Sequence, residues 1–175
     1  DILAYSRLES GAEPKAISLD EIVADIQREQ TTEHSNCKID CEPLPTINGD
    51  RGQLQQLLTN LIGNGLKYNE SDEPQINISA GACDAGYRIA ISDNGIGIPQ
   101  EHYDKIFDMF VRVHGGSRFQ GSGIGLAICK RVMELHEGTI DVCASPDGGS
   151  TFTCLFPEHR ITKRVGDAAN LNIAS

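Results

Sequence analysis

The sequence contains no apolar run approaching the roughly 20 residues that a membrane-spanning helix needs, and no signal-peptide pattern opens it. Its first residue is Asp1 and not methionine, so we expect it to be part of a longer protein. We therefore predict a chain that is not inserted in a membrane. We expect it in the cytoplasm, whether the longer protein is soluble or membrane-anchored.

Basic residues are few in this chain. It has 15 Lys and Arg residues against 25 Asp and Glu residues, a formal net charge of −10. An acidic chain is repelled by phosphate backbones and by anionic lipid. This balance argues against duplex nucleic acid or a membrane surface as the main partner.

Paired cysteine motifs are also missing. None of the six cysteines belongs to a CxxC pair, and Cys37 and Cys41 have no nearby His or Cys at zinc-binding spacing. We expect free, partly buried thiols in a reducing compartment. A disulfide or a metal site is the alternative.

The order of periodic segments predicts the fold. Apolar periodicity indicates long helices over about 19–33, from about 50, and over about 123–136, the first after a capping box of Ser18 and Glu21. Alternation predicts strands near 37–41, 46–48, 76–82, 87–91, 139–144 and 150–156. This pattern indicates an α+β fold, a two-layer α/β sandwich in which three main helices cover one face of a mixed, mostly antiparallel sheet.

The remaining segments set the expected domain limits. Residues 1–12 read as the end of a helix and a linker, residues 13–157 as the folded domain, and residues 158–175 as a polar, disordered tail. A short helix is expected at 100–107, and the glycine-rich stretch 108–121 is expected to be a mobile loop.

A polar stripe runs along the second long helix. At about 100° per residue, Asn60, Asn64 and Lys67 lie on one side, roughly a third of a turn from the leucine face. A carboxamide oxygen can bind Mg²⁺, which usually keeps several waters and bridges to phosphates, and Lys67 adds a positive charge. The alternative is that these are simply solvated helix residues.

Two glycine-rich segments follow predicted strands or precede a helix. In SDNGIGIP (92–99), Asp93 ends a strand, where its carboxylate could accept a hydrogen bond from an exocyclic amine of a flat ligand. In GSGIG (121–125), three glycines enter a helix whose first N–H groups form an anion site. Ordinary turns and helix packing explain either segment when it is taken alone.

Charge distribution favours the anion site. Residues 109–133 contain four bases and no acid, namely Arg112, Arg118, Lys130 and Arg131, while the rest of the chain is strongly acidic. A polyphosphate would bind such a basic, glycine-rich region. A basic solvated face is the alternative.

A final segment, GGSTF (148–152), offers the hydroxyls of Ser150 and Thr151 at a strand start, although a plain turn and strand would look the same.

Together these segments resemble the Bergerat-type ATP-binding fold of the GHKL superfamily, and most closely the catalytic, ATP-binding domain of sensor histidine kinases. The resemblance covers about residues 15–157 and includes an N box (60–68), a first glycine box (93–97), an F box (107–110, with Arg112), a second glycine box (121–125) and the GGSTF segment (148–152). Five ordered boxes are far more specific than any one of them.

The resemblance implies an enzyme that binds ATP and Mg²⁺ and transfers the γ-phosphoryl group to a histidine of a separate dimerisation domain. Asn64 would hold Mg²⁺, Asp93 would recognise adenine, and residues 108–121 would form a lid. The implied catalytic residues are Asn60, Asn64, Lys67 and Arg112. The implied nucleotide-contacting residues are Asn64, Lys67, Tyr68, Asp93, Gly95, Gly97, Ile98, Phe107, Arg118, Gly121, Ser122, Gly123, Ile124, Gly125, Leu126 and Thr151.

Family analogy also implies partners. They are the phosphoacceptor domain of the same protein, a response regulator receiver domain and, for the longer protein, a second copy in a homodimer. None of the five histidines of this chain lies in the acceptor context His-Glu/Asp-Leu-Arg-Thr-Pro. We therefore expect the chain to bind ATP without phosphorylating itself.

The sequence departs from its relatives at two places in the N box. ATP-hydrolysing members of the superfamily carry a water-activating Glu where this chain has Asn60, which favours a kinase over an ATPase. A serine-kinase relative is a further alternative. Gly63 and Gly65 stand inside the helix, where each costs roughly 0.5 to 1 kcal/mol relative to Ala. They are the only support for a third alternative, a degenerate partner-binding module.

Overall fold

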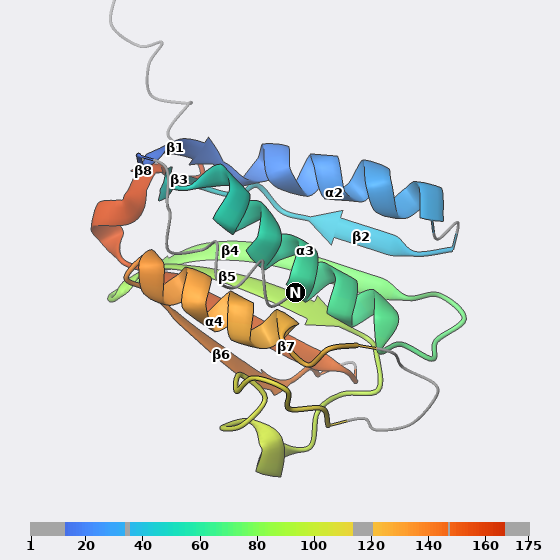
Figure 1. Ribbon diagram of the computed structural model, residues 1–175. Helices are drawn as coiled ribbons and strands as arrows, with labels where there is room; N and C mark the ends of the chain where they lie inside the picture. Colours follow the sequence, from blue (N-terminus) through green and yellow to red (C-terminus); the bar gives the residue numbers. More distant parts are fainter. Residues whose placement is uncertain (1–12, 34–35, 114–120, 147, 167–175) are drawn as a thin grey trace, which may run out of the picture.

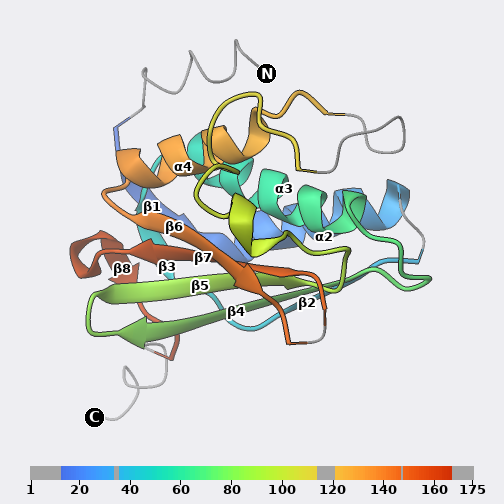
Figure 2. The ribbon, with the colours of Figure 1, turned by 90° about the horizontal axis from the view of Figure 1, so that it is seen from below.

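The computed structural model describes residues 13–33, 36–113, 121–146 and 148–166. In these segments, helices and strands form two layers (Figures 1 and 2). Three long helices lie over one face of a five-stranded sheet, and no helix of the described residues lies over the opposite face. This is the predicted α+β sandwich. None of the helices in the described segments is long and apolar enough to cross a bilayer.

The main sheet is mixed and mostly antiparallel. Its order is β2-β4-β5-β7-β6, in which only the pair of β2 and β4 is parallel. The strands are β2 (Lys38–Cys41), β4 (Gln75–Cys83), β5 (Gly86–Asp93), β6 (Thr139–Ala144) and β7 (Ser150–Phe156). A smaller antiparallel sheet, β1-β3-β8, is built from β1 (Lys15–Ser18), β3 (Thr46–Gly49) and β8 (Ile161–Lys163).

The helices begin where local hydrogen bonds satisfy their first N–H groups. α2 (Leu19–Glu33) follows Ser18, whose Oγ accepts from the Glu21 N–H at 3.4 Å, as the capping box predicts. α3 (Arg51–Lys67) follows Asp50, whose carboxylate accepts from the Gln53 N–H at 2.9 Å. α4 (Gly125–Leu135) begins without a side-chain cap. This exception matters for the site.

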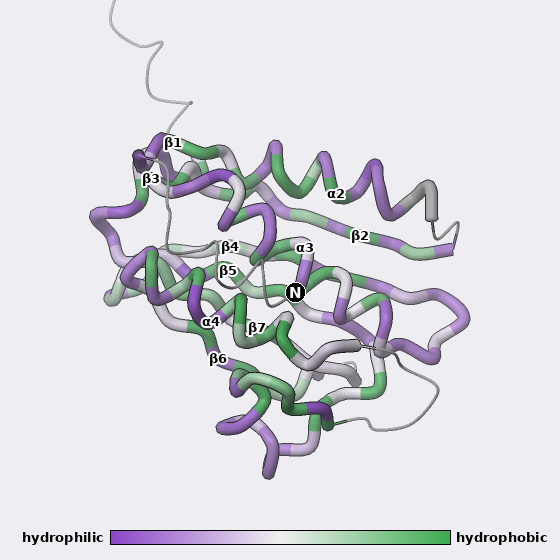
Figure 3. The backbone as a smooth tube through the Cα atoms, in the orientation of Figure 1, coloured by the Kyte–Doolittle hydropathy of each residue, from purple (hydrophilic) through white to green (hydrophobic). Residues whose placement is uncertain are grey.

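One hydrophobic core fills the space between the layers. The apolar face of each helix is buried against the inward-facing side chains of the sheet, including Ile78, Ile91 and Phe152. Because side chains alternate along a strand, Ile91 opposes Phe152 in the ladder and both point to the helices. Figure 3 shows the helical counterpart along α2, whose turns are hydrophobic on one side and hydrophilic on the other. All six cysteines are free, and Cys129 and Cys154 are buried in this core.

Three expectations differ from the structure or fall outside it. Residues 158–163 are not a disordered tail, because they form a short 3₁₀ turn (η2, Glu158–Arg160) and β8, which pairs with β3. The expected helix at 100–107 is only a 3₁₀ turn, η1 (Gln100–His102), followed by further turns. Residues 1–12, 114–120 and 167–175 lie outside the described residues, and so do the expected helix end and half of the expected lid.

Of the two N-box glycines inside α3, one has a packing reason. A Cβ at Gly65 would lie 2.5 Å from Ile76 Cδ1 and 3.0 Å from Asp93 Cβ, whereas a Cβ at Gly63 would meet nothing within 4 Å. Close approach of α3 to the sheet therefore requires a glycine at 65 only.

We predict that Gly63→Ala raises the free energy of unfolding by about 0.5–1 kcal/mol, because it removes the entropic cost of a helical glycine without a clash. Gly65→Ala should show no such gain, because Ile76 and Asp93 would have to move. Urea denaturation of both variants measures this. Equal stabilisation by the two substitutions would contradict the packing argument.

A buried histidine joins the end of α4 to the start of α3. His136 is 2 % exposed, its Nδ1 lies 2.8 Å from the Val132 carbonyl oxygen, and its Nε2 lies 3.3 Å from the Asp50 backbone N. The first contact needs a proton on Nδ1 and the second needs a bare Nε2, so the neutral ring fits both. Burial lowers the pKa of His136, and the neighbouring Arg160 lowers it further, while the Val132 carbonyl and Asp50 raise it.

This histidine should make folding acid-sensitive. Below about pH 6.5 the unfolded chain binds a proton at His136 that the folded chain resists, so stability falls as pH falls from that value toward the lowered pKa. We predict that His136→Gln flattens the dependence of unfolding free energy on pH between about 7 and 5. The exposed His159, which pairs with Glu137, supplies the control substitution His159→Gln. Parallel pH profiles for wild type and His136→Gln would refute the role.

Candidate functional site

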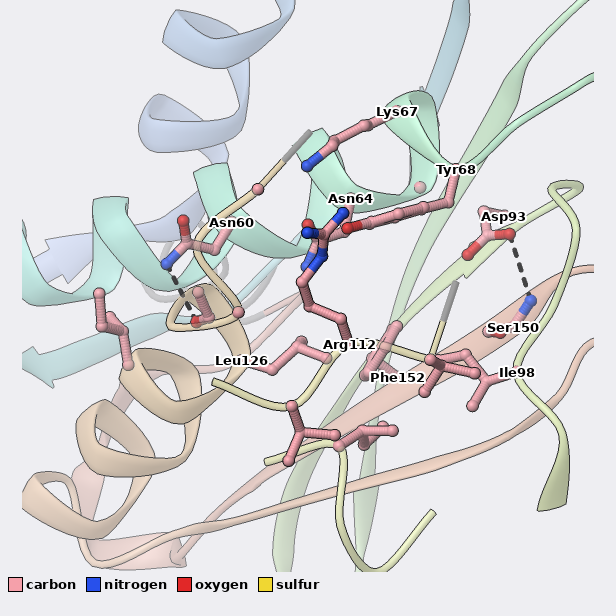
Figure 4. A pocket seen from close by; sticks show the side chains of 18 of the residues that line it. Asn60, Asn64, Lys67, Tyr68, Asp93, Ile98, Arg112, Leu126, Ser150 and Phe152 are labelled. Atoms are coloured by element: carbon pink, nitrogen blue, oxygen red, sulfur yellow. Dashed lines mark hydrogen bonds between the residues drawn. The ribbon is translucent and has the colours of Figure 1, made fainter. Parts of the chain in front are cut away.

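A cavity of about 270 Å³ opens between α3, α4 and the ends of β5 and β7. Figure 4 shows it from close by. It collects most of the predicted site residues from four separate parts of the chain. From the end of α3 come Asn60, Asn64, Lys67 and Tyr68; from the β5 turn come Asp93, Gly97 and Ile98. Arg112 comes from the F-box segment, and the segment that leads into α4 supplies Gly121, Ser122, Gly123, Gly125 and Leu126.

The α3 stripe faces the cavity, but its members make different contacts. The Asn60 side-chain amide donates to the Gly125 carbonyl oxygen at 3.3 Å, which ties α3 to the first turn of α4 (Figure 4). The Asn64 carboxamide makes no hydrogen bond to any residue that the structure describes. Its oxygen is therefore available to a ligand in the cavity.

Lys67 brings positive charge to the mouth of the cavity. Its ammonium lies 4.8 Å from the centre of the Tyr68 ring, and a Cβ at Gly121 would come within 2.7 Å of its Nζ. Arg112 approaches from the other side, and its guanidinium points toward Asn64 and Tyr68 (Figure 4). These are the two basic side chains that line the cavity in the described part of the chain.

Of the four bases in residues 109–133, Arg112 lines the cavity and two others do not. Lys130 and Arg131 lie further along α4 and do not line the cavity, and Arg131 pairs with Glu134 at 3.3 Å. Arg118 lies outside the described residues. Helical geometry explains why Lys130 and Arg131 do not line the cavity, since both lie one to two turns from the N-terminus of α4.

Asp93 closes the opposite end of the cavity. Its Oδ1 accepts from the backbone N–H groups of Gly95 at 2.8 Å and Ser150 at 3.2 Å, and the second of these bonds is drawn in Figure 4. Burial raises the pKa of Asp93, while these two donors favour the ionised form and oppose the rise. With Oδ1 committed, Oδ2 is the oxygen left for a ligand.

The second glycine segment is held by the F-box segment. The Phe110 N–H donates to the Gly123 carbonyl at 2.9 Å, and Gly123 has φ +71°. A Cβ at Gly123 would lie 2.9 Å from the Phe110 carbonyl carbon, so the two backbones need a glycine to touch. Because Ile124 gives α4 no side-chain cap, the N–H groups of its first turn at Gly125 and Leu126 remain suited to an anion.

Some predicted residues do not line the cavity. Gly95 packs beneath it against the Tyr68 carbonyl, and Phe107 supports it through an edge contact with Phe152, with ring centroids 6.4 Å apart. Ile124 is buried at the start of α4. Thr151 points to the far face of the sheet, where its Oγ1 lies 2.8 Å from Ser92 Oγ. Strand alternation is the reason, because Ser150 and Phe152 occupy the helix-facing positions of β7.

Sequence reasoning offered the hydroxyls of Ser150 and Thr151 but kept only Thr151 among the predicted site residues, whereas Ser150 is the one that lines the cavity. The alternation of Phe152, Cys154 and Phe156 could have separated the two, since Ser150 shares their face. Sequence reasoning also missed the apolar wall that Ile106, Val111 and Val113 form around the cavity. Those residues lie in irregular backbone, where periodicity gives no signal.

Comparisons with known proteins agree with this geometry. Residues 49–160 match the family model described as histidine kinase-, DNA gyrase B- and HSP90-like ATPase. Cyanobacterial phytochrome A of Nostoc sp. is 36% identical over 162 residues, which cover 90% of this chain and 21% of that protein. The phosphate regulon sensor protein PhoR of Pseudomonas aeruginosa is 29% identical over 172 residues, which cover 93% of this chain and 39% of that protein.

Solved structures give the same picture. The mycobacterial sensor histidine kinase MprB matches with a TM-score of 0.73 at 23% identity, over 82% of this chain and 97% of that one. Full-length ShkA, solved in complex with AMPPNP, matches with a TM-score of 0.74 at 25% identity, over 93% of this chain and 35% of that one. The chain spans well under half the length of these curated relatives. It belongs to the histidine kinase-, DNA gyrase B- and HSP90-like ATPase family, as a domain of the type that binds ATP in sensor histidine kinases.

Proposed function

We propose that this chain binds ATP with Mg²⁺ and positions the γ-phosphoryl group for transfer to a histidine of a separate dimerisation domain. One observation carries the proposal: a single cavity has a carboxylate with an available oxygen at one end, and at the other it has two bases, a helix N-terminus and a carboxamide that makes no hydrogen bond within the described residues. A nucleoside triphosphate matches this arrangement, because its base can donate a hydrogen bond to the carboxylate and its phosphates are anions that the basic end would attract.

The Asp93 end suits adenine. Its Oδ2 would accept a hydrogen bond from the exocyclic amine, which guanine replaces with a carbonyl oxygen. Tyr68 and Ile98 line the same region and offer apolar surface to the flat base. Gly97 has φ +72°, and its backbone lies on the cavity wall without a side chain in the way.

The opposite end suits phosphates. The first turn of α4, Lys67 and Arg112 would stabilise the negative charge of the γ-phosphoryl group as it leaves. The Asn64 oxygen is a hard ligand of the kind that Mg²⁺ accepts, and the ion would neutralise phosphate charge there. These residues hold and orient the reactant, so catalysis in this chain would consist of positioning and electrostatics.

The residue at position 60 favours a kinase over an ATPase. Asn60 is a neutral amide bonded to the Gly125 carbonyl, so it has neither the basicity nor the freedom to activate water. The proposed partners are a phosphoacceptor domain of the same protein, a response regulator receiver domain and a second copy of the protein, in the cytoplasm. A GHKL ATPase or a degenerate partner-binding module are the alternatives that binding and turnover measurements distinguish.

We predict that Asn64→Ala and Asp93→Asn each weaken binding of a magnesium complex of a non-hydrolysable ATP analogue by roughly tenfold to a hundredfold, the loss of one charge-assisted contact. Isothermal titration calorimetry measures this. Asn77→Ala and Asp141→Asn replace exposed residues of the same types on the sheet and serve as controls. Unchanged affinity in both site variants, or no heat with the wild type, would reject the proposed site.

We also predict that the chain incubated with γ-labelled ATP forms no stoichiometric phosphohistidine and releases phosphate slowly, because it lacks both an acceptor context and a water-activating Glu. Labelling should appear when a dimerisation domain carrying the acceptor helix of the longer protein is added. Rapid phosphate release by the chain alone would favour the ATPase alternative. Stoichiometric self-labelling would contradict the assignment of a separate acceptor.

A further inference from the structure

Two asparagines outside the cavity join its two ends. Asn69 follows α3, and Asn94 follows β5. The Asn69 amide Nδ2 donates to Asn94 Oδ1 at 2.7 Å and to the Gly65 carbonyl at 3.3 Å. The pair therefore connects the last turn of α3 to the turn that begins directly after Asp93.

Both side chains are used fully by the backbone around them. Asn94 Oδ1 also accepts from the Gln75 N–H at 2.8 Å, and its Nδ2 donates to the Glu73 carbonyl at 3.1 Å. Asn69 Oδ1 accepts from the Ser71 N–H at 2.9 Å. The loop between α3 and β4 is thus fastened to the β5 turn at several points, with the asparagine pair at its centre.

The fastened elements are those that carry the site. The last turn of α3 presents Asn64, Lys67 and Tyr68, and the Tyr68 carbonyl accepts from the Ile96 N–H at 3.0 Å. The β5 end presents Asp93. Neither Asn69 nor Asn94 lines the cavity itself.

We infer that Asn69 and Asn94 are positioning residues that fix the distance and orientation between the adenine end and the phosphate end of the nucleotide site. The inference rests on the proposed function and extends it to the selectivity for the base. A ligand held at both ends binds more tightly when the last turn of α3 and the end of β5 are already in place, because no free energy is then spent on ordering them. A carboxylate held in one orientation accepts from the adenine amine and repels the carbonyl oxygen of guanine.

Loss of the pair should lower both affinity and selectivity. Asn69→Ala and Asn94→Ala should each weaken binding of the magnesium complex of the imido analogue of ATP about fivefold. They should weaken binding of the corresponding GTP analogue less. The selectivity ratio, which is the dissociation constant of the GTP analogue divided by that of the ATP analogue, therefore falls. The double substitution should cost less than the sum of the two single substitutions, because each single substitution already removes the shared bond between Asn69 and Asn94.

Calorimetry with both analogues on wild type, the two single variants and the double variant tests this. Asn77→Ala removes an exposed amide from β4 and is the matched control. Thermal unfolding of each variant verifies folding. Asn69→Ser keeps a donor near the Gly65 carbonyl but is too short to reach Asn94, so it replaces Asn69→Ala if that variant does not fold.

The outcomes separate the inference from the function on which it rests. A lowered selectivity ratio in folded variants supports the positioning role. Equal weakening of both analogues, or unchanged binding of both, overturns it, since a merely structural bond would leave the ratio alone. A wild-type chain that binds neither analogue overturns the proposed function and the inference together.

Discussion

The close contact between the last turn of α3 and the end of β5 is the constraint on which the site depends. Gly65 permits it, because any Cβ there would press on Ile76 and Asp93. With the helix this close, the Asn64 carboxamide and the Asp93 carboxylate line the same cavity. If α3 lay further from β5, the Asp93 carboxylate and the Asn64 carboxamide would be too far apart to contact the same ligand.

Hydrogen bonds around this contact either orient side chains of the site or join secondary structure elements. Some prepare the groups that would touch a nucleotide, as when Gly95 and Ser150 hold Asp93 Oδ1 and leave Oδ2 exposed to the cavity. Others join secondary structure elements, as Asn60 joins α3 to α4 through the Gly125 carbonyl. Chemistry that depends on positioning and electrostatics needs both, because the reacting groups must be in place before the reaction begins.

Much of the fold was predictable because periodicity is a local property. The helix from Leu19, the strand pair around residues 84–86 and the alternating β7 all follow from spacing of apolar residues. The short C-terminal strand β8 was missed, because three residues carry too little pattern and are held by pairing with β3. The turns at 100–107 were overestimated as a helix for a similar reason, since their backbone is set by packing around the cavity.

The amino-acid sequence by itself determined the family, the three helices and the residue types available to the site, because motifs and periodicity are written along the chain. Only the tertiary structure decided which of those residues face the cavity. It turned Thr151 toward Ser92 and Ser150 toward the cavity, and it carried Lys130 and Arg131 away from the cavity. The physical reason is that strand alternation and helix rotation choose a side chain's face only after neighbouring elements have fixed which face is inside.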